Sequence, residues 1–150
     1  NQMKISAAIM VIGLLCAVLM QQCNAVTLRE LYKTVKGYLK KGEANHLVKE
    51  VDSLYHFKVA ENSGKESQFT LDFKRAPPSL DEGLIGKPDA TIILSEQVFN
   101  EILSKQYGFK RAVFTGKVQI EGSVFAANRL KDDYFPIPTP ENVKHYSQYI

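Results

Sequence analysis

The sequence predicts an α+β domain with a mainly antiparallel sheet, and three patterns lead to that prediction. Residues 27–41 carry apolar side chains at helical spacing. Residues 55–59 and 69–73 alternate apolar and polar side chains, and the glycine turn between them, at Ser63-Gly64, is typical of a β-hairpin. Further helical patterns follow the hairpin. Strands joined in this way, with helices before and after them, favour a sheet packed against a layer of helices.

The first helix is predicted to begin at Thr27 and to stop at Gly42, with Thr27 and Glu30 in the positions of a capping box. Its apolar face carries Leu28, Leu31, Tyr32, Val35, Tyr38 and Leu39. A basic stripe runs along the other side and consists of Arg29, Lys33, Lys36 and Lys40. Such a stripe is either a solvated face or a surface that docks on anionic lipid headgroups.

The middle of the chain predicts one more short helix, the hairpin and a buried strand. The helix covers residues 45–53, and the strands of the hairpin present Tyr55, Phe57, Val59, Phe69, Leu71 and Phe73 on one face. The proline- and glycine-rich stretch 75–88 allows one short edge strand near Ser79 and Leu80. The β-branched run 90–94 predicts a buried strand, and Ser95 is expected to cap a helix that ends near Lys105.

The last third of the domain predicts a strand over residues 112–121 and a short helix after Ser123. In that strand Phe114, Gly116, Val118 and Ile120 share one face, with polar side chains on the other. The helix is expected to bury Val124, Ala127 and Leu130, and Phe125 is a further candidate. Residues 134–150 contain three prolines two residues apart, which predicts an extended tail that packs loosely or is disordered. The domain is therefore placed at residues 26–133.

The first 25 residues have the features of a cleaved signal peptide. Lys4 precedes an uncharged, almost wholly apolar run from Ile5 to Met20, and Cys23 and Ala25 place small side chains before a cleavage site. The alternative is a membrane anchor, but sixteen helical residues span only about 24 Å, less than the roughly 30 Å of hydrocarbon in a bilayer. Cleavage after Ala25 would remove both cysteines, so no disulfide is expected.

Composition and motifs argue against catalysis, metal binding and nucleic-acid binding. Basic and acidic residues number 19 and 16, which gives a net charge of only +3. The pair Gly116-Lys117 lies inside the predicted strand and is followed by valine, so it does not fit a phosphate-binding loop. The three histidines are expected at the surface, His56 on the polar face of its strand. No spacing typical of a zinc or calcium site occurs. The chain is thus interpreted as a binding protein without catalytic residues, metal or cofactor.

Large rings are numerous for about 125 residues, which leaves two interpretations of the interior. One is an ordinary core. The other is a cavity between sheet and helices that holds an acyl chain or a sterol, since each buried methylene group contributes about 0.8 kcal/mol.

Three segments resemble the sterol carrier protein type 2 domain family. They are "YHFKV" with "GKESQFTLDFK", then "KPDATIILSEQVFNEIL", and above all "AVFTGKVQIEGSVFAANRL", within a match from about Leu31 to Leu130. The resemblance implies a five-stranded, mainly antiparallel sheet covered by about five helices. It also implies an apolar tunnel for a fatty acid, fatty acyl-CoA, sterol or phospholipid, and transfer through contact with a membrane. The tunnel residues that it implies are Phe114, Gly116, Val118, Ile120, Phe99, Ile102, Leu103, Val124, Phe125, Leu130, Leu71 and Phe73.

The resemblance also leads to expectations about the tunnel mouth, the localisation and the partners of the protein. At a tunnel mouth, Lys110 or Arg111 would meet a carboxylate or phosphate, or else be solvated loop charges. The last three residues are Gln148-Tyr149-Ile150, which differ from the peroxisomal Ser-Lys-Leu terminus of many family members. A secreted or luminal, monomeric lipid carrier that touches anionic membranes is expected. The alternative is a protein-interaction module, or an accessory domain that presents lipid to a separate enzyme.

Overall fold

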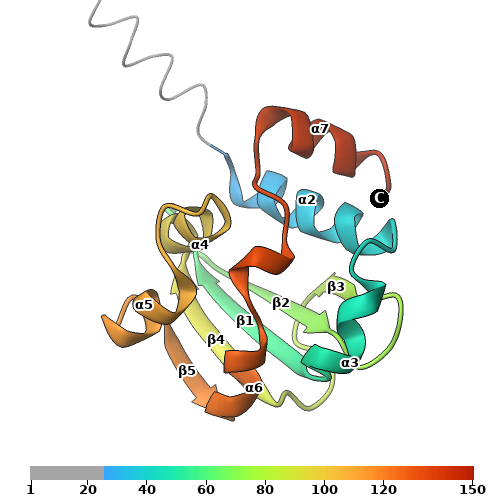
Figure 1. Cartoon of the computed structure of the whole chain (residues 1–150). Helices are drawn as coiled ribbons and strands as arrows, with labels where there is room; N and C mark the ends of the chain where they lie inside the picture. Colours follow the sequence, from blue (N-terminus) through green and yellow to red (C-terminus); the bar gives the residue numbers. More distant parts are fainter. Residues whose placement is uncertain (1–25) are drawn as a thin grey trace, which may run out of the picture.

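The computed structural model describes residues 26–150 and shows one sheet with helices packed against it (Figure 1). Five strands and six α-helices make up this part of the chain, which confirms the predicted α+β class and the five-stranded sheet. The predicted signal peptide, residues 1–25, lies outside the described residues. None of the helices described between residues 26 and 150 has the length and apolar character needed to cross a membrane.

The sheet has the strand order β3-β2-β1-β4-β5. Its strands are β1 (Leu54–Ala60), β2 (Glu66–Asp72), β3 (Ser79–Glu82), β4 (Ala90–Ser95) and β5 (Gln119–Gly122). Three of the four pairings are antiparallel and only β1 and β4 run parallel, so the sheet is mainly antiparallel as predicted. Phe57 in β1 pairs with Phe69 in β2 and with Ile92 in β4, which places the aromatic face of the hairpin in the centre of the sheet.

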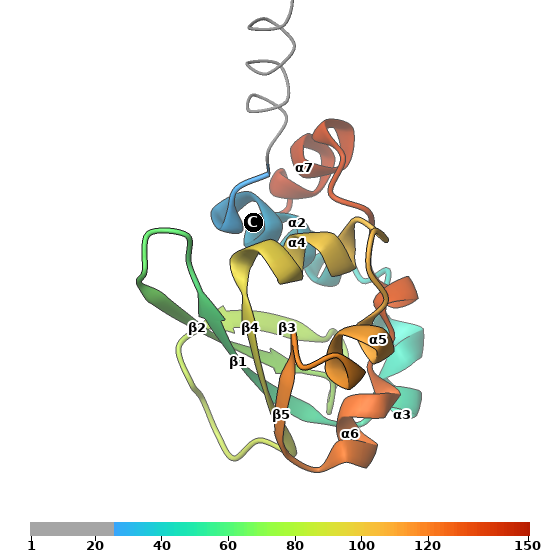
Figure 2. The same cartoon turned by 90° about the vertical axis from the view of Figure 1, so that its left-hand side faces the viewer.

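The helices lie mostly on one side of the sheet (Figure 2). They are α2 (Leu28–Lys40), α3 (Val48–Val51), α4 (Glu96–Leu103), α5 (Phe109–Phe114), α6 (Val124–Arg129) and α7 (Pro140–Ser147). Thr27, Ser95 and Ser123 cap α2, α4 and α6 with their hydroxyl groups, as expected. In the predicted capping box, the Glu30 carboxylate accepts a hydrogen bond from the Thr27 hydroxyl at 3.1 Å. Glu30 therefore contacts the capping side chain itself.

The predicted strand over residues 112–121 is wrong in its first half. Residues 109–114 form α5, and Gly116 follows in a turn with a φ of +81°, so β5 begins only at Gln119. The reason is that Phe109, Ala112 and Val113 share one side of a helix and pack toward the core, which leaves Phe114 91% exposed. Over so short a run the helical and strand periods are easily confused.

The C-terminal segment is also ordered, contrary to the prediction of a loose tail. Pro140 occupies the first turn of α7, where the missing N–H group costs no hydrogen bond, and the Thr139 hydroxyl caps the helix. Helix α7 packs along α2, and the two cross so closely at Gly37 that an added Cβ would lie 1.8 Å from the Tyr146 carbonyl oxygen. Figure 1 shows α7 lying along α2.

His56 lies on the face of the sheet opposite Phe57, but it is buried and not exposed as expected. The loop after β3 covers this face, and the backbone carbonyl of Ile85 lies 3.0 Å from Nε2 of His56. The same loop is fixed by Thr70, whose hydroxyl donates to the Gly83 carbonyl and accepts from the Ile85 N–H.

Candidate functional site

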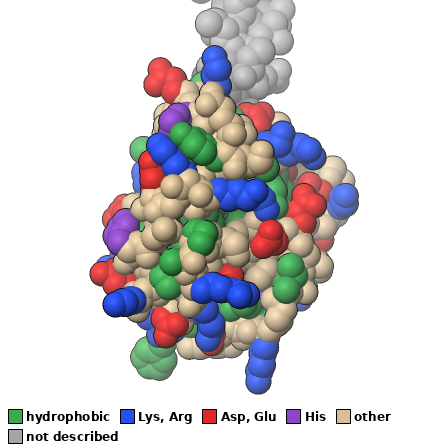
Figure 3. All heavy atoms as spheres, turned by 90° about the vertical axis from the view of Figure 1, so that its right-hand side faces the viewer, with side chains coloured by type: hydrophobic (Ala, Val, Ile, Leu, Met, Phe, Trp, Pro, Cys, Tyr) green, Lys and Arg blue, Asp and Glu red, His purple; other side chains and the backbone are tan. Residues whose placement is uncertain are grey.

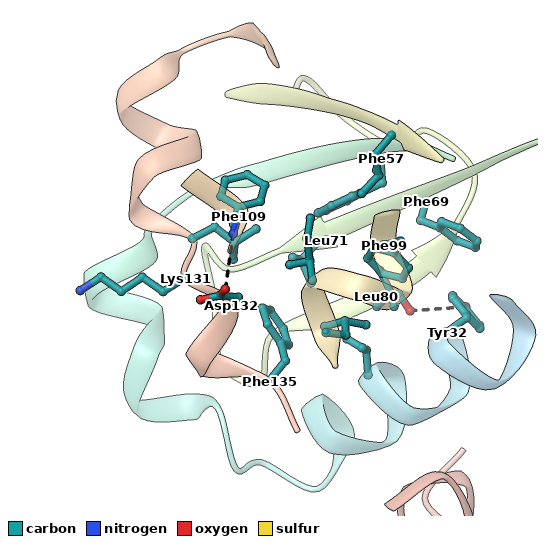
Figure 4. Close-up of a pocket in the computed structure, with 15 residues that line it drawn as sticks. Tyr32, Phe57, Phe69, Leu71, Leu80, Phe99, Phe109, Lys131, Asp132 and Phe135 are labelled. Atoms are coloured by element: carbon teal, nitrogen blue, oxygen red, sulfur yellow. Dashed lines mark hydrogen bonds between the residues drawn. The ribbon is translucent and has the colours of Figure 1, made fainter. Parts of the chain in front are cut away.

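An apolar cavity of about 60 Å³ lies between the sheet and the helices α2 and α4 (Figure 4). Its walls are built almost entirely from aliphatic and aromatic side chains, with two polar residues at one side. The lining residues are Tyr32, Val35, Phe57, Phe69, Leu71, Leu80, Leu94, Phe99, Ile102, Leu103, Phe109, Leu130, Lys131, Asp132 and Phe135.

The strand pattern explains the floor of this cavity. Side chains two residues apart in a strand point to the same face, so Phe69 and Leu71 of β2 join Phe57 of β1 on the helix side. The ring of Phe57 then meets the ring of Phe99 from α4 at a centroid distance of 6.2 Å and a tilted angle. Helix α2 closes the opposite side with Tyr32 and Val35, which its helical period directs inward.

Phe135 closes the cavity from the C-terminal segment. Its ring meets the edges of Phe73 and Tyr38, each at a centroid distance of 6.3 Å, and so bridges the sheet and α2. Figure 4 shows the ring of Phe135 among the lining side chains. The segment predicted to be a loose tail therefore forms part of the wall.

The polar side of the cavity is occupied by structural hydrogen bonds. The Asp132 carboxylate accepts from the backbone N–H of Phe109 at 3.4 Å, and Lys105 donates to the Asp132 carbonyl oxygen. Lys131 lies over the ring of Tyr134 at 5.9 Å. Among residues 26–150 no group of histidines, cysteines or carboxylates is arranged to hold a metal ion.

Five of the twelve residues implied as tunnel lining are brought together in the cavity wall: Leu71, Phe99, Ile102, Leu103 and Leu130. Their contact with a lipid stays a prediction, as does a continuous tunnel. Phe73 is fully buried just behind Phe135. Val118 is buried and Ile120 partly buried, but neither lines the cavity.

The remaining four implied residues lie at the surface. Val124 is 56% and Phe125 81% exposed, because α6 buries Ala126 and Ala127 instead. Phe114 and Gly116 belong to the exposed end of α5 and the turn after it, and no atom lies within 4 Å of a Cβ added at Gly116. The space beside Gly116 is solvent and not part of the cavity.

Sequence reasoning missed the aromatic and aliphatic residues that complete the wall, chiefly Tyr32, Phe57, Phe69, Leu80 and Phe135. The alternation of the hairpin does contain the signal for Phe57 and Phe69, which lie on the same face as Leu71. Phe135 carries no such signal, since its position depends on the path of the chain after α6.

The basic residues expected at the surface divide into two groups. The Lys36 ammonium group donates to the Asp81 carboxylate at 3.1 Å, to the Leu80 carbonyl at 2.8 Å and to the Tyr32 hydroxyl at 3.2 Å, so it is not free for a membrane. Burial lowers the pKa of Lys36, but the hydrogen bonds to Asp81 and Tyr32 outweigh this effect and hold its pKa above the ordinary value. Arg29 and Lys40 are exposed and Lys33 is partly exposed.

Lys110 and Arg111, expected at a tunnel mouth, lie on α5 outside the cavity wall. Arg111 stacks over the ring of Tyr107 at 4.8 Å, and Lys117 approaches the same ring at 4.3 Å. Basic and acidic side chains are interspersed on the face of the molecule that Figure 3 shows. That mixture agrees with the small net charge of the chain.

Comparison with known proteins gives a consistent result. A model of the SCP-2 sterol transfer family matches residues 33–133. The chain is 26% identical over 103 residues to human "Sterol carrier protein 2" and 22% identical over 96 residues to mouse "Peroxisomal multifunctional enzyme type 2". These matches cover 68% and 63% of this chain, but only 19% and 13% of those longer proteins.

Solved structures share the fold. Sterol Carrier Protein 2 from Yarrowia lipolytica, in its apo form, has a TM-score of 0.59 at 20% identity, covering 67% of this chain and 90% of its own. Palmitated SCP2L2 from Aedes aegypti has a TM-score of 0.60 at 19% identity, covering 73% of this chain and 95% of its own. The family model spans more than half of the chain. All five strands lie within the part it matches, as do the lining residues of the cavity except Tyr32 and Phe135. The chain therefore belongs to the SCP-2 sterol transfer family.

Proposed function

We propose that this chain binds a single lipid in the apolar cavity and transfers it between membranes without catalysing a reaction. Membership of the SCP-2 sterol transfer family indicates lipid binding and transfer. The observation that carries the proposal for this chain is the cavity itself, whose wall is apolar and lies between two structural layers. The candidate ligands are a fatty acid, a fatty acyl-CoA, a sterol or a phospholipid.

The volume of the cavity implies that its walls move when a lipid enters. An apolar cavity of roughly 150 Å³ admits a molecule the size of benzene, and this one measures about 60 Å³. A long acyl chain therefore displaces lining side chains, and Phe99, Phe109 and Phe135 are only partly buried. The gain from sequestering sixteen carbons is roughly 10 kcal/mol before association and repacking costs, at about 0.8 kcal/mol per methylene group.

We place the protein outside the cell or in a luminal compartment, delivered by the signal peptide over residues 1–25. Arg29, Lys33 and Lys40 are the residues of α2 that would contact an anionic membrane, each contributing about 1 kcal/mol near such a surface. Lys36 contributes less, because it is held by Asp81. N-terminal sequencing of secreted protein checks the first point, and a start far from Val26 contradicts it.

Lipid extraction followed by mass spectrometry tests the main proposal. The protein purified from cells is expected to carry a lipid, and the delipidated protein is expected to bind a fluorescent fatty acid that natural lipids displace. Absence of both co-purified lipid and probe binding refutes the proposal.

A pair of matched substitutions locates the site. Val35 lines the cavity on α2, so Val35→Phe fills space that the lipid needs and is expected to weaken probe binding at least tenfold, which corresponds to about 1.4 kcal/mol. Val124→Phe makes the same change at a side chain that is 56% exposed, and it is expected to leave affinity unchanged. Equal affinity of both variants and the unmodified protein would place the lipid elsewhere.

A further inference from the structure

A second, larger hollow adjoins the cavity and differs from it in chemistry. This headgroup groove, as we call it, has a volume of about 680 Å³ and lies between α2 and the end of the β1–β2 hairpin. Its walls carry several basic and acidic side chains, whereas those of the cavity are apolar apart from Lys131 and Asp132. Two residues, Tyr32 and Phe69, line both hollows.

These two rings form the boundary between the groove and the cavity. Tyr32 and Phe69 stack with their centroids 5.1 Å apart and their planes at 26°, one ring coming from α2 and the other from β2. Figure 4 shows the pair at the edge of the cavity, at the α2 side. Because the two rings come from separate elements, a connection between the hollows would require α2 and the hairpin to move apart at this stack.

The α2 wall of the groove is basic. Arg29, Lys33 and Lys36 follow one another at one-turn spacing and all line the groove, whereas Lys40 of the same stripe does not. Within residues 26–150, neither Arg29 nor Lys33 forms an ion pair. Lys36 stands beside the Tyr32 hydroxyl, next to the boundary, and its ion-pair partner Asp81 has a half-exposed side chain.

The opposite wall is mainly acidic. Glu61, Glu66 and Glu82 line it from the hairpin and β3, together with Lys65 at the hairpin turn. Glu66 accepts a hydrogen bond from Gln68, and neither Glu61 nor Glu82 forms an ion pair within the described part of the chain. A ligand that carries only negative charge would meet repulsion at this wall, while one that carries both signs matches both walls.

We propose that the headgroup groove binds the zwitterionic headgroup of a phospholipid while one acyl chain passes between Tyr32 and Phe69 into the cavity. The phosphate lies against Arg29 and Lys33, and the ammonium group lies against the wall that carries Glu82. The inference rests on the proposed lipid-binding function and names its ligand class. It also gives the basic stripe of α2 a second role, since Lys33 then recognises a single bound lipid as well as a membrane surface.

Three single-chain ligands of equal chain length test the assignment: palmitoyl lysophosphatidylcholine, palmitate and monopalmitoyl glycerol, each titrated as monomers into the delipidated full chain. Lys33→Ala is expected to weaken the lysophospholipid and palmitate roughly fivefold, the scale of an exposed charge pair, and to leave the neutral glyceride unchanged. Glu82→Gln is expected to weaken only the lysophospholipid. Inorganic phosphate in equal concentration is expected to displace none of them, since it has no chain for the cavity.

Lys40→Ala is the matched control, because it removes a charge of the same stripe that does not line the groove. It is expected to reduce association with phosphatidylserine vesicles while leaving monomer binding unchanged. The inference is overturned if all three ligands bind with no dependence on Lys33 or Glu82, or if Lys40→Ala weakens the lysophospholipid as much as Lys33→Ala. If none of the three ligands binds, the proposed lipid-binding function itself fails.

Discussion

Gly37 is a point at which α2 and α7 approach each other closely. The Tyr146 backbone occupies the space that a side chain at position 37 would need, with its carbonyl oxygen 1.8 Å and its carbonyl carbon 2.6 Å from an added Cβ. Backbone atoms cannot rotate away as the end of a side chain can. A single missing methyl group therefore permits the contact between two helices that lie more than a hundred residues apart.

Gly37→Ala is expected to displace α7 from α2. Overpacking costs about 1–3 kcal/mol, while alanine favours the interior of α2 by about 1 kcal/mol relative to glycine. The expected result is loss of hydrogen-exchange protection in residues 140–147 with α2 itself intact. Gly108→Ala, where an added Cβ meets nothing within 4 Å, serves as the control and should leave α7 protected. Unchanged protection in both variants would contradict the tight crossing.

At the scale of the element, α7 is held by a polar and aromatic cluster as well as by close packing. The Tyr146 hydroxyl donates to the Glu43 carboxylate at 2.8 Å, Glu43 pairs with Lys41 at 2.9 Å, and the Tyr146 ring meets the edge of Tyr38 at 5.6 Å. Burial, followed by the hydrogen bond to Glu43, raises the pKa of Tyr146 to about 12. The docking of α7 is therefore coupled to the ionisation of Tyr146.

Because the pKa of Tyr146 is raised in the folded protein, we expect α7 to detach from α2 at strongly alkaline pH. The folded pKa of Tyr146 exceeds its ordinary value of 10.0, so its contribution to stability is fully present below pH 10 and is lost as the pH rises through about 12. The difference in absorbance at 295 nm between the unmodified protein and Tyr146→Phe isolates this tyrosine and is expected to titrate near pH 12. A midpoint close to 10 would show that the Tyr146 hydroxyl is solvated and α7 undocked.

At the scale of the whole molecule, the layered arrangement makes lipid binding and stability interdependent. The cavity lies between α2, α4 and the sheet, so its ligand would complete the core that joins the two layers. A ligand that binds only the folded state stabilises it by about 2.7 kcal/mol at one hundred times its dissociation constant. Opening of the cavity costs packing contacts, and occupation by a lipid replaces them.

Delipidated protein is consequently expected to unfold several degrees below lipid-loaded protein in thermal denaturation. A stabilisation of 1 kcal/mol shifts the midpoint by roughly 2–8 °C for domains of this general size. Val35→Phe, with its cavity filled, is expected to show no such shift on addition of lipid, whereas Val124→Phe should shift like the unmodified protein. A shift in Val35→Phe as large as that of the unmodified protein would indicate binding outside the cavity.

Particular residues show how far the site could be predicted. Phe99, Ile102 and Leu103 were placed on the right helix and face, because an eight-residue amphipathic helix capped by Ser95 repeats its pattern long enough to be unambiguous. Phe114 was misplaced because residues 109–114 form a helix where a strand was predicted. Phe125 was misplaced because α6 has only six residues, and a run of that length does not fix which side is buried. Tyr32 was assigned to the buried face of α2, but its position at the boundary of the cavity depends on Phe69.

The sequence by itself determined the sheet class, the hairpin, the caps of α2, α4 and α6, and the family, since each depends on local spacing or on residue types in order. Only the tertiary structure decided which rings enclose the cavity, that Lys36 pairs with Asp81, and that α7 covers α2. These features join residues such as Gly37 and Tyr146, or Tyr32 and Phe69, that are distant along the chain. Periodicity reports which side of one element is buried, whereas the partner on that side is fixed only when the elements pack together.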